Sequence, residues 1–334
     1  MSFSPLNRTP DGETNAAYQH LQDNILPTPN WIDTRQNNSY EDTPMQLTFR
    51  HAESWQNTVD VDFNAQYQVL REEHGNPIPE AILFPLITEY IIAKIQSGDD
   101  EETDITEKWV EDCAPVNTAL MESLNRSHRE VHHVTISPKK RTRQTATRIL
   151  TWIVPIDEDI LKRDWRMKVS WVNISLNQTI TERDFWSHIG YYHWWARWCL
   201  QKPDQRERFQ KWCWSAWRSY FRDISRWEMN MFLNVVSDNR KAETRENVIQ
   251  RVRWKTQQLL DITDRNWVNI MVTHAWTIKA LVQGIINPEW EKERLEWLFN
   301  SQEFTPRNTS MTVIGRSRES DLLLMWYNLW PSRE

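Results

Sequence analysis

Two arginines and two histidines follow segments with the pattern of buried strands. They are Arg50, His51, Arg141 and His274. Arg50 and His51 come directly after the alternating run 45–49, and His274 directly after the apolar run 268–273. Arg141 comes shortly after the run 133–136, at the start of a helix-like segment. Because strand carboxyl ends meet at one edge of an open α/β sheet, we expect one shared site.

The chemistry of these residue types favours phosphoryl transfer. Guanidinium groups bind a tetrahedral, multiply charged anion through paired hydrogen bonds, and phosphate is the commonest such ligand. Backbone amides at the start of the helix in 137–146 would add to an anion site. A neutral imidazole can attack phosphorus and form a covalent intermediate, and a second, cationic imidazole would stabilise the transferring group. A nucleoside triphosphate kinase is disfavoured, because the sequence has no glycine-rich phosphate loop.

The elements that must position these residues alternate between strand and helix. The strand patterns are 45–49, 133–136, 268–273 and 310–314. Two helices are predicted between them, one starting at Thr244 and one starting at Asn287 and running to Phe299. This order predicts an α/β fold, a three-layer sandwich in which helices cover both faces of a mainly parallel sheet.

The sequence also predicts how the chain is organised. Residues 1–44 have the composition of a flexible polar tail, and 45–334 form the α/β domain, with insertions around 95–130 and 180–235. The second insertion is expected to form a helical cap over the strand ends. Its regular aromatic stripe, 209–227, favours an amphipathic helix packed on the core. The alternative is that its interleaved Trp and Arg residues stack on single-stranded nucleic acid.

Composition excludes several classes of protein. The 334 residues carry 40 Lys and Arg against 46 Asp and Glu, and this net charge of -6 disfavours binding to duplex DNA. No apolar run is long enough to span a bilayer, and the first thirty residues lack the apolar stretch of a secretory signal. Three scattered cysteines, Cys113, Cys199 and Cys213, suit neither a disulfide framework nor a zinc site, so we expect a cytoplasmic protein.

Two further features of the composition affect the site. The chain has 6 glycines where average usage would give about 23, so some positions that need a positive φ are expected to be strained. A run of basic residues predicts a locally positive approach for an acidic substrate. Its members are Arg126, His128, Arg129, Lys139, Lys140, Arg141 and Arg143.

Four segments together resemble the phosphoglycerate-mutase-like branch, branch 1, of the histidine phosphatase superfamily. Residues 50–54 with Asn57 resemble its RHG motif, and 137–146 is similar to its SPLxRAxQTA signature. Residues 272–275 resemble its second-histidine motif and 308–310 its closing NxS segment. The segments occur in the family's order.

The resemblance implies a role for each matching residue. His51 would be the nucleophile that becomes phosphohistidine, and Arg50, Arg141 and His274 would hold the phosphoryl oxygens. Further substrate contacts would come from Ser54, Asn57 and the backbone N–H of Ala275. Members of the family need no metal or organic cofactor for hydrolysis. The implied partner is a phosphorylated small molecule or a phosphoprotein, with no nucleic acid and no membrane.

Three positions depart from the family pattern. Ala52 replaces the motif's glycine, a small-for-small change, and Trp276 stands where the family has a small residue. The family's general acid is a glutamate in a stretch like LxExxxG, whereas the candidate stretch 161–167 has Asp164 as its nearest carboxylate. The other candidates are Asp157, Glu158 and Asp159, followed by Glu182 and Asp184.

Phosphomonoester hydrolysis through His51 is therefore the expected activity. Two alternatives remain at this point. The same residues could move phosphate between hydroxyls of one molecule, as in a phosphoglycerate mutase. The missing glutamate and Trp276 would instead fit an impaired, phosphate-binding scaffold member of the family.

Overall fold

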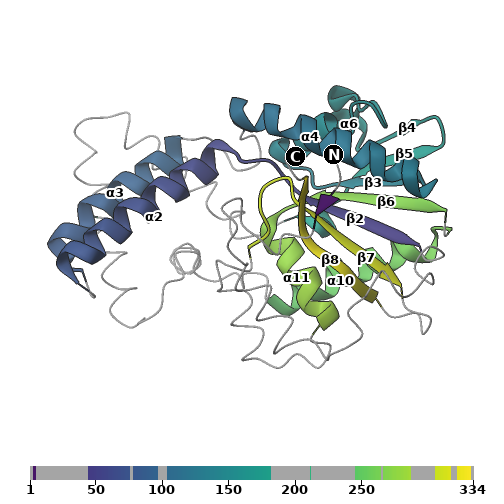
Figure 1. Cartoon of the computed structure of the whole chain (residues 1–334). Helices are drawn as coiled ribbons and strands as arrows, with labels where there is room; N and C mark the ends of the chain where they lie inside the picture. Colours follow the sequence, from purple (N-terminus) through teal and green to yellow (C-terminus); the bar gives the residue numbers. More distant parts are fainter. Residues whose placement is uncertain are drawn as a thin grey trace. The chain divides into compact units, whose positions relative to one another are not determined.

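The computed structural model describes most of one compact unit and part of a second (Figure 1). The described residues are 3–4, 44–75, 78–96, 104–181, 211, 245–264, 266–286, 305–316 and 322–331. The first unit comprises 1–52, 105–183 and 245–334, and the second comprises 53–104 and 184–244. All four residues predicted to bind phosphate belong to the first unit.

An eight-stranded sheet forms the centre of the first unit, in the order β1-β8-β7-β2-β6-β3-β5-β4. The strands are β1 Phe3–Ser4, β2 Met45–Arg50, β3 Glu130–Ile136, β4 Arg166–Val169, β5 Val172–Leu176, β6 Trp267–Thr273, β7 Met311–Arg316 and β8 Leu322–Pro331. The four central strands β2, β6, β3 and β5 pair in parallel, and the outer strands pair antiparallel. The four strands predicted from the sequence are β2, β3, β6 and β7, so the mainly parallel sheet is confirmed.

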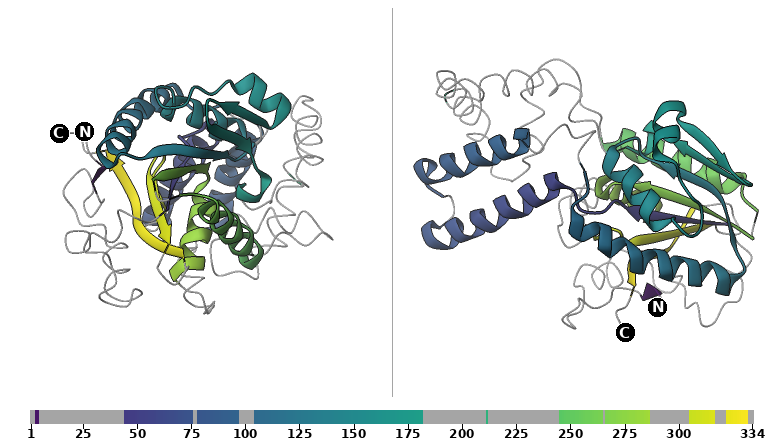
Figure 2. Two further views of the ribbon diagram at one scale, coloured as in Figure 1. Left: turned by 90° about the vertical axis from the view of Figure 1, so that its right-hand side faces the viewer. Right: turned by 90° about the horizontal axis from the view of Figure 1, so that it is seen from above.

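Helices cover both faces of this sheet (Figure 2). The blue and teal helices on one face are α4 Glu107–Ser127, α5 Lys140–Ile149 and α6 Glu158–Asp164. The green helices on the opposite face are α10 Arg245–Asp261 and α11 Ala275–Ile286, with the short helix η3 Gln178–Ile180 against α10. The predicted three-layer α/β architecture is therefore confirmed.

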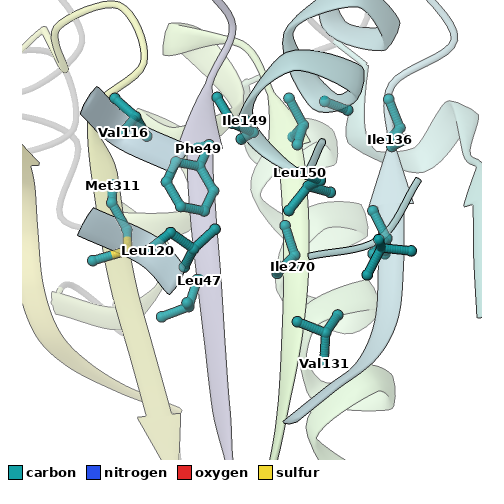
Figure 3. Packing of buried hydrophobic residues seen from close by; sticks show 14 of the residues in the cluster. Leu47, Phe49, Val116, Leu120, Val131, Ile136, Ile149, Leu150, Ile270 and Met311 are labelled. Carbon is teal, nitrogen blue, oxygen red and sulfur yellow. The ribbon is translucent and has the colours of Figure 1, made fainter. Parts of the chain in front are cut away.

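The larger core lies between the sheet and helices α4 to α6 (Figure 3). Leu47 and Phe49 of β2 and Ile270 of β6 pack against Val116 and Leu120 of α4. These five side chains are almost completely buried. The range 95–130, predicted as an insertion, thus contains a helix whose apolar face covers the sheet.

The second core joins α10 and α11 to the other face of the sheet. Val248, Ile249 and Val252 of α10 are fully buried, as the predicted helix after Thr244 requires. Gly284 of α11 allows the two helices to approach closely, because a Cβ there would lie 2.6 Å from the Ile249 Cγ2 atom. The two cores fix the positions of the strand ends from both sides.

The second unit contains an α-helical hairpin that the sequence did not predict. Its helices are α2 Trp55–His74 and α3 Glu80–Gln96, joined by a short connection. Phe63 and Tyr67 of α2 belong to the same buried cluster as Leu83 of α3. The rings of Phe63 and Tyr90 lie 4.5 Å apart, centroid to centroid.

Several predicted segments lie outside the described residues. They include most of the range 180–235, with every residue of 209–227 except 211, and the helix predicted from Asn287 to Phe299. Of the predicted tail 1–44, the structure describes Pro44 and the two residues of β1, which pair with β8. None of the described helices is long and apolar enough to cross a membrane.

Candidate active site

The carboxyl ends of β2 and β6 lie side by side, and this pairing positions Arg50 and His51. Arg50 is in register with Thr273, and the backbone N–H of His51 donates to the Thr273 carbonyl at 2.8 Å. On its other side, Arg50 exchanges backbone hydrogen bonds with the loop before β7, through Thr309 and Ser310. His51 is therefore fixed by strand pairing.

The imidazoles of His51 and His274 lie against each other. Their ring centroids are 5.0 Å apart with an interplanar angle of 63°. Both side chains are buried, with 2% and 0% of their surfaces exposed. Residues 223 positions apart in the sequence thus share one space, as the order of strand ends predicted.

The surroundings of His51 determine which of its nitrogens is available. Nδ1 lies 2.5 Å from the carbonyl oxygen of Ala52. Because a carbonyl oxygen can only accept, Nδ1 carries the proton in this hydrogen bond. The Nε2 atom of the neutral ring then keeps its lone pair, as a nucleophile requires.

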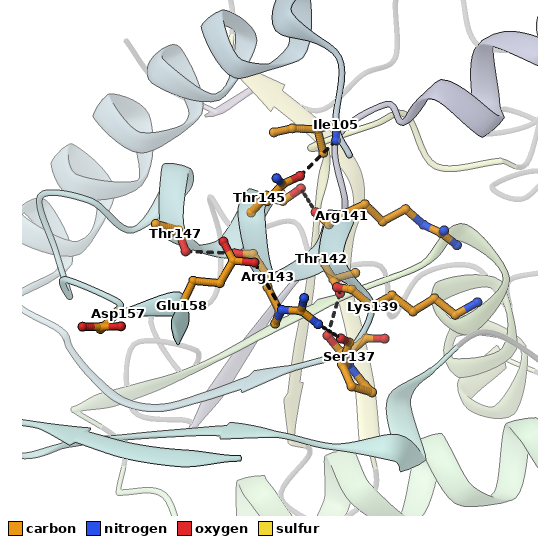
Figure 4. Close-up of polar contacts among 12 residues, drawn as sticks. Ile105, Ser137, Lys139, Arg141, Thr142, Arg143, Thr145, Thr147, Asp157 and Glu158 are labelled. Atoms are coloured by element: carbon orange, nitrogen blue, oxygen red, sulfur yellow. Dashed lines mark hydrogen bonds and ion pairs between the residues drawn. The ribbon is translucent and has the colours of Figure 1, made fainter. Parts of the chain in front are cut away.

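Arg141 and Ser137 contact the second histidine. The Ser137 hydroxyl lies 2.8 Å from His274 Nε2, and a terminal nitrogen of Arg141 lies 3.5 Å from His274 Nδ1. In Figure 4 the side chains of Lys139 and Arg141 extend from the start of α5 to the same side. The segment after β3 therefore supplies a buried guanidinium beside both imidazoles.

Helix α5 also holds the residue that follows His51. The Thr145 hydroxyl accepts the backbone N–H of Ala52 at 2.9 Å and donates to the Arg141 carbonyl at 2.6 Å. Thr145 was not among the predicted site residues. The only sequence signal for it was its place in the 137–146 segment, one helical turn after Arg141.

Burial and the neighbouring cations keep the histidines neutral. Burial lowers the pKa of His51 well below 6.5, and the charges of Arg141 and Arg50 lower it further. Burial, followed by Arg141 and His51, likewise lowers the pKa of His274 well below 6.5. Lys279 of α11 is also buried, and burial together with Arg50 lowers its pKa to about 7. Such a concentration of buried positive charge favours an anionic ligand.

The other residues predicted at or near the substrate are divided between the two units. Ala275 is the first residue of α11, so its backbone N–H has no acceptor within the helix, as the predicted anion contact requires. Trp276 packs against the core of α10 and α11. Ser54 and Asn57 belong to the second unit, and the Asn57 side chain lies outside the described part of the structure.

Asp164 does not join this group. Its carboxylate is 47% exposed and is bound at 2.9 Å by the guanidinium of its neighbour Arg163. An exposed, paired carboxylate is ionised and cannot act as a general acid, so we withdraw the prediction. The pKa of Asp164 is correspondingly lowered, chiefly by the hydrogen bond from Arg163.

The other carboxylates of this helix have structural partners or face solvent. Asp157 caps α6 by accepting the backbone N–H of Ile160 at 2.9 Å. Glu158 pairs with the buried Arg143 at 3.3 Å (Figure 4), and Asp159 is exposed. Glu182 and Asp184 lie outside the described residues.

The predicted run of basic residues divides into two groups. Arg126, His128 and Arg129 precede β3, whereas Lys139 and Arg141 follow it. A strand of seven residues separates its ends by roughly 20 Å, so the first group lies at the opposite edge of the sheet. Of the predicted run, the members that follow β3 are those at the edge of the sheet where His51 lies.

The scarcity of glycine does leave strained backbone beside the site. Thr309, fully buried next to Arg50, has a φ of 56°, which is rare for a β-branched residue. The loop that contains it accepts the Arg50 guanidinium, which donates to the Pro306 carbonyl at 2.5 Å. The expectation of positive φ at residues other than glycine is thus confirmed at the loop that binds Arg50.

Comparisons with solved structures find matches of low sequence identity that extend over most of the chain. YhfR of Bacillus stearothermophilus is 13% identical, with a TM-score of 0.46 and coverage of 85% of this chain and 96% of its own. A mycobacterial glucosyl-3-phosphoglycerate phosphatase is 12% identical, with a TM-score of 0.41 and coverage of 85% and 98%. The ecdysone phosphate phosphatase of Bombix mori, in complex with tungstate, is 14% identical, with a TM-score of 0.41 and coverage of 87% and 95%.

These structures belong to the histidine phosphatase superfamily, which the motifs around His51, Arg141 and His274 resemble. No family model and no curated protein sequence matches the chain. At identities of 12–14% the likeness concerns the fold. The function therefore has to be argued from the side chains of this chain.

Proposed function

We propose that the protein hydrolyses phosphomonoesters through a phosphohistidine on His51. The observation that carries this proposal is the pairing of His51 Nδ1 with the Ala52 carbonyl, which leaves Nε2 with a free lone pair. That ring is buried among the charges of Arg50 and Arg141, which would bind the oxygens of a phosphoryl group. A neutral nucleophile next to fixed cations suits attack on an anionic phosphate ester.

The reaction would take two displacements at phosphorus. In the first, the Nε2 lone pair bonds to phosphorus while the bond to the ester oxygen breaks, and the departing oxygen takes a proton from a general acid. In the second, water attacks phosphorus and returns a proton to the group that acted as the general acid, the bond between nitrogen and phosphorus breaks, and inorganic phosphate leaves. Arg50, Arg141 and the N–H of Ala275 would hold the phosphoryl oxygens in both steps. His274 would complete this group, and no metal or organic cofactor enters.

Glu182 is our proposed proton donor in place of Asp164. Thr181, the residue before it, is held beside the site. Its carbonyl accepts the Thr277 hydroxyl at 3.0 Å, within one helical turn of His274, and the Arg251 guanidinium at 2.9 Å. Glu182 is the next residue of the chain, and of the remaining candidates it is the nearest in the sequence to Thr181.

A substitution of Glu182 tests this role through the choice of leaving group. Glu182→Gln should depress turnover of an alkyl phosphate by about 10²–10⁴-fold, because the alkoxide needs a proton. Turnover of nitrophenyl phosphate should change far less, since its leaving group is already stable. Equal losses on both substrates would show that Glu182 is not the donor.

Product analysis tests the proposed activity against its alternative. The protein should release inorganic phosphate from nitrophenyl phosphate, and His51→Ala should abolish that release. A mutase, given a phosphate ester that carries a second hydroxyl, would instead return an isomerised ester with little free phosphate. We propose that the substrate is a phosphorylated small molecule or a phosphoprotein. We also propose that the protein acts in the cytoplasm.

A further inference from the structure

A polar strip covers part of the sheet at the end remote from β1. Val172, Ile174 and Leu176 of β5 pack in the larger core, so the alternate residues Asn173 and Ser175 face the opposite side. That side is the one on which α10 lies. The register extends the strip to β4, because Arg166 pairs with Ser175 and Lys168 pairs with Asn173.

This strip forms one wall of a cavity of about 340 Å³. Asn173, Ser175 and Asn177 line it from β5 and the residue that follows, and Arg166 lines it from β4. Lys255 contributes from α10. The volume falls in the range of small-molecule sites. Within the described residues, the lining set includes none of the residues around His51.

The charges in this cavity have one sign. In the part of the chain that the structure describes, neither Arg166 nor Lys255 forms an ion pair with a carboxylate. Burial, followed by the charge of Arg166, lowers the pKa of Lys255. The pKa of the neighbouring His133 is lowered to about 4, chiefly by burial and to a lesser extent by the charge of Lys255. Two cations held at one cavity repel each other unless an anion lies between them.

Protection of a sheet edge explains only part of this arrangement. β4 is the last strand of the sheet, and charged side chains on an edge strand prevent pairing with other chains. That function would require Arg166 and Lys168 alone. It does not require a lysine from a helix to face the same cavity, nor the amide and hydroxyl groups of β5 between the two cations.

We propose that this cavity binds a small phosphorylated molecule, at a site separate from the one around His51. Arg166 would bind the phosphoryl oxygens through paired hydrogen bonds and Lys255 as a point charge, the usual division between these side chains. Asn173 and Ser175 supply neutral hydrogen-bonding groups at the same wall. The proposal does not depend on catalysis by His51.

Calorimetric titration of the full chain with inorganic pyrophosphate tests the proposal. Arg166→Gln and Lys255→Gln should each weaken one binding event by about tenfold or more, as expected for loss of a charge-assisted hydrogen bond. Arg126→Gln is the matched control, because it removes an exposed charge of α4, on the opposite face of the sheet, and should change affinity less than about twofold.

A variant of the other site separates the two proposals. The binding event should persist in Arg141→Gln, and thermal unfolding of each variant checks that it is folded. Binding that disappears in Arg141→Gln and is unchanged in Arg166→Gln and Lys255→Gln would overturn the second site. Equal small losses in Arg166→Gln, Lys255→Gln and Arg126→Gln would overturn it too, because they would reflect general charge. If the protein did not turn over nitrophenyl phosphate, that result would contradict catalysis by His51 but not the second site.

Discussion

Burial decides the charge of the two histidines and, through it, their chemistry. Both imidazoles lie under a guanidinium and away from solvent, and both pKa values are lowered for that reason. A protonated His51 would have no lone pair at Nε2. The same burial therefore keeps His51, the proposed nucleophile, in its neutral form at neutral pH.

This burial makes stability depend on pH in a predictable direction. The unfolded chain binds protons at its histidines near pH 6.5, whereas the folded chain does so only at lower pH, so folding is weakened as pH falls below about 6.5. Each buried histidine contributes at most about 1.4 kcal/mol per pH unit to this loss. Urea unfolding at pH 7, 6 and 5 should show a shallower decline for His274→Asn than for the natural chain.

An exposed histidine provides the control for this measurement. His128→Asn changes the same side chain at the left-handed end of α4, a conformation that Asn tolerates. It should keep the steep decline of the natural chain. Identical slopes for the natural chain and His274→Asn would contradict the assignment of buried neutral histidines.

At the scale of elements, helix α5 holds the residue that follows His51, the proposed nucleophile. Its Thr145 hydroxyl is the acceptor for the N–H of Ala52, whose carbonyl in turn orients the His51 ring. Thr145→Val should leave that buried N–H without its acceptor, at a cost of about 1–3 kcal/mol in stability. As a positioning residue, Thr145 should affect kcat more than KM, and Thr145→Ser should restore both.

The same helix offers a matched control. The Thr147 hydroxyl also donates to the carbonyl four residues earlier, that of Arg143, at 3.0 Å. Within the described residues, however, it accepts no backbone N–H from the segment after β2. Thr147→Val should therefore keep kcat within about twofold. Parallel losses of kcat in Thr145→Val and Thr147→Val would mean that helix stability alone is responsible.

Periodicity identified the elements whose burial is one-sided or complete. The strands β2, β3, β6 and β7 show clean apolar patterns, and each was predicted within a few residues. The strands β4 and β5 were missed because they are only four and five residues long, although Val172, Ile174 and Leu176 of β5 alternate with polar residues. The strand β8 was missed because its continuous apolar run, 322–327, carries no period.

The site could be predicted in part, for a physical reason. Strand ends are positions that a sequence pattern reveals, so Arg50, His51, Arg141 and His274 could be grouped from the sequence alone. A proton donor has no such marker, because its role depends on the path of the chain after β5. The nearest carboxylate in the sequence, Asp164, precedes β4 and β5, whereas the chain returns to the site only at Thr181.

At the scale of the molecule, the net charge and the local charge oppose each other. The chain carries -6 overall, whereas the charges that act on His51 are those of the cations Arg141, Arg50 and Lys139. Fields at short range are less screened than those at long range, so the local cations should dominate for an anionic substrate. The value of kcat/KM for nitrophenyl phosphate should therefore fall as ionic strength rises, as a salt series would show.

Lys139 provides a test of that local field. Its charge acts on both His51 and His274, and Lys140 beside it is not among the charges that do so. Lys139→Gln should lower kcat/KM about fivefold at low salt and flatten the salt dependence, as loss of about 1 kcal/mol of attraction implies. Lys140→Gln should do neither, and a rate that rises with salt would show that net charge dominates.

The central claim is that His51 carries the phosphoryl group between the two displacements. Rapid quenching of the full chain after mixing with an aryl phosphate, followed by mass spectrometry of peptides kept at alkaline pH, measures this directly. We predict one acid-labile phosphoryl group on the peptide that contains His51, absent from His51→Ala. Steady turnover with no phosphorylated His51, or with the label on another residue, would contradict the account.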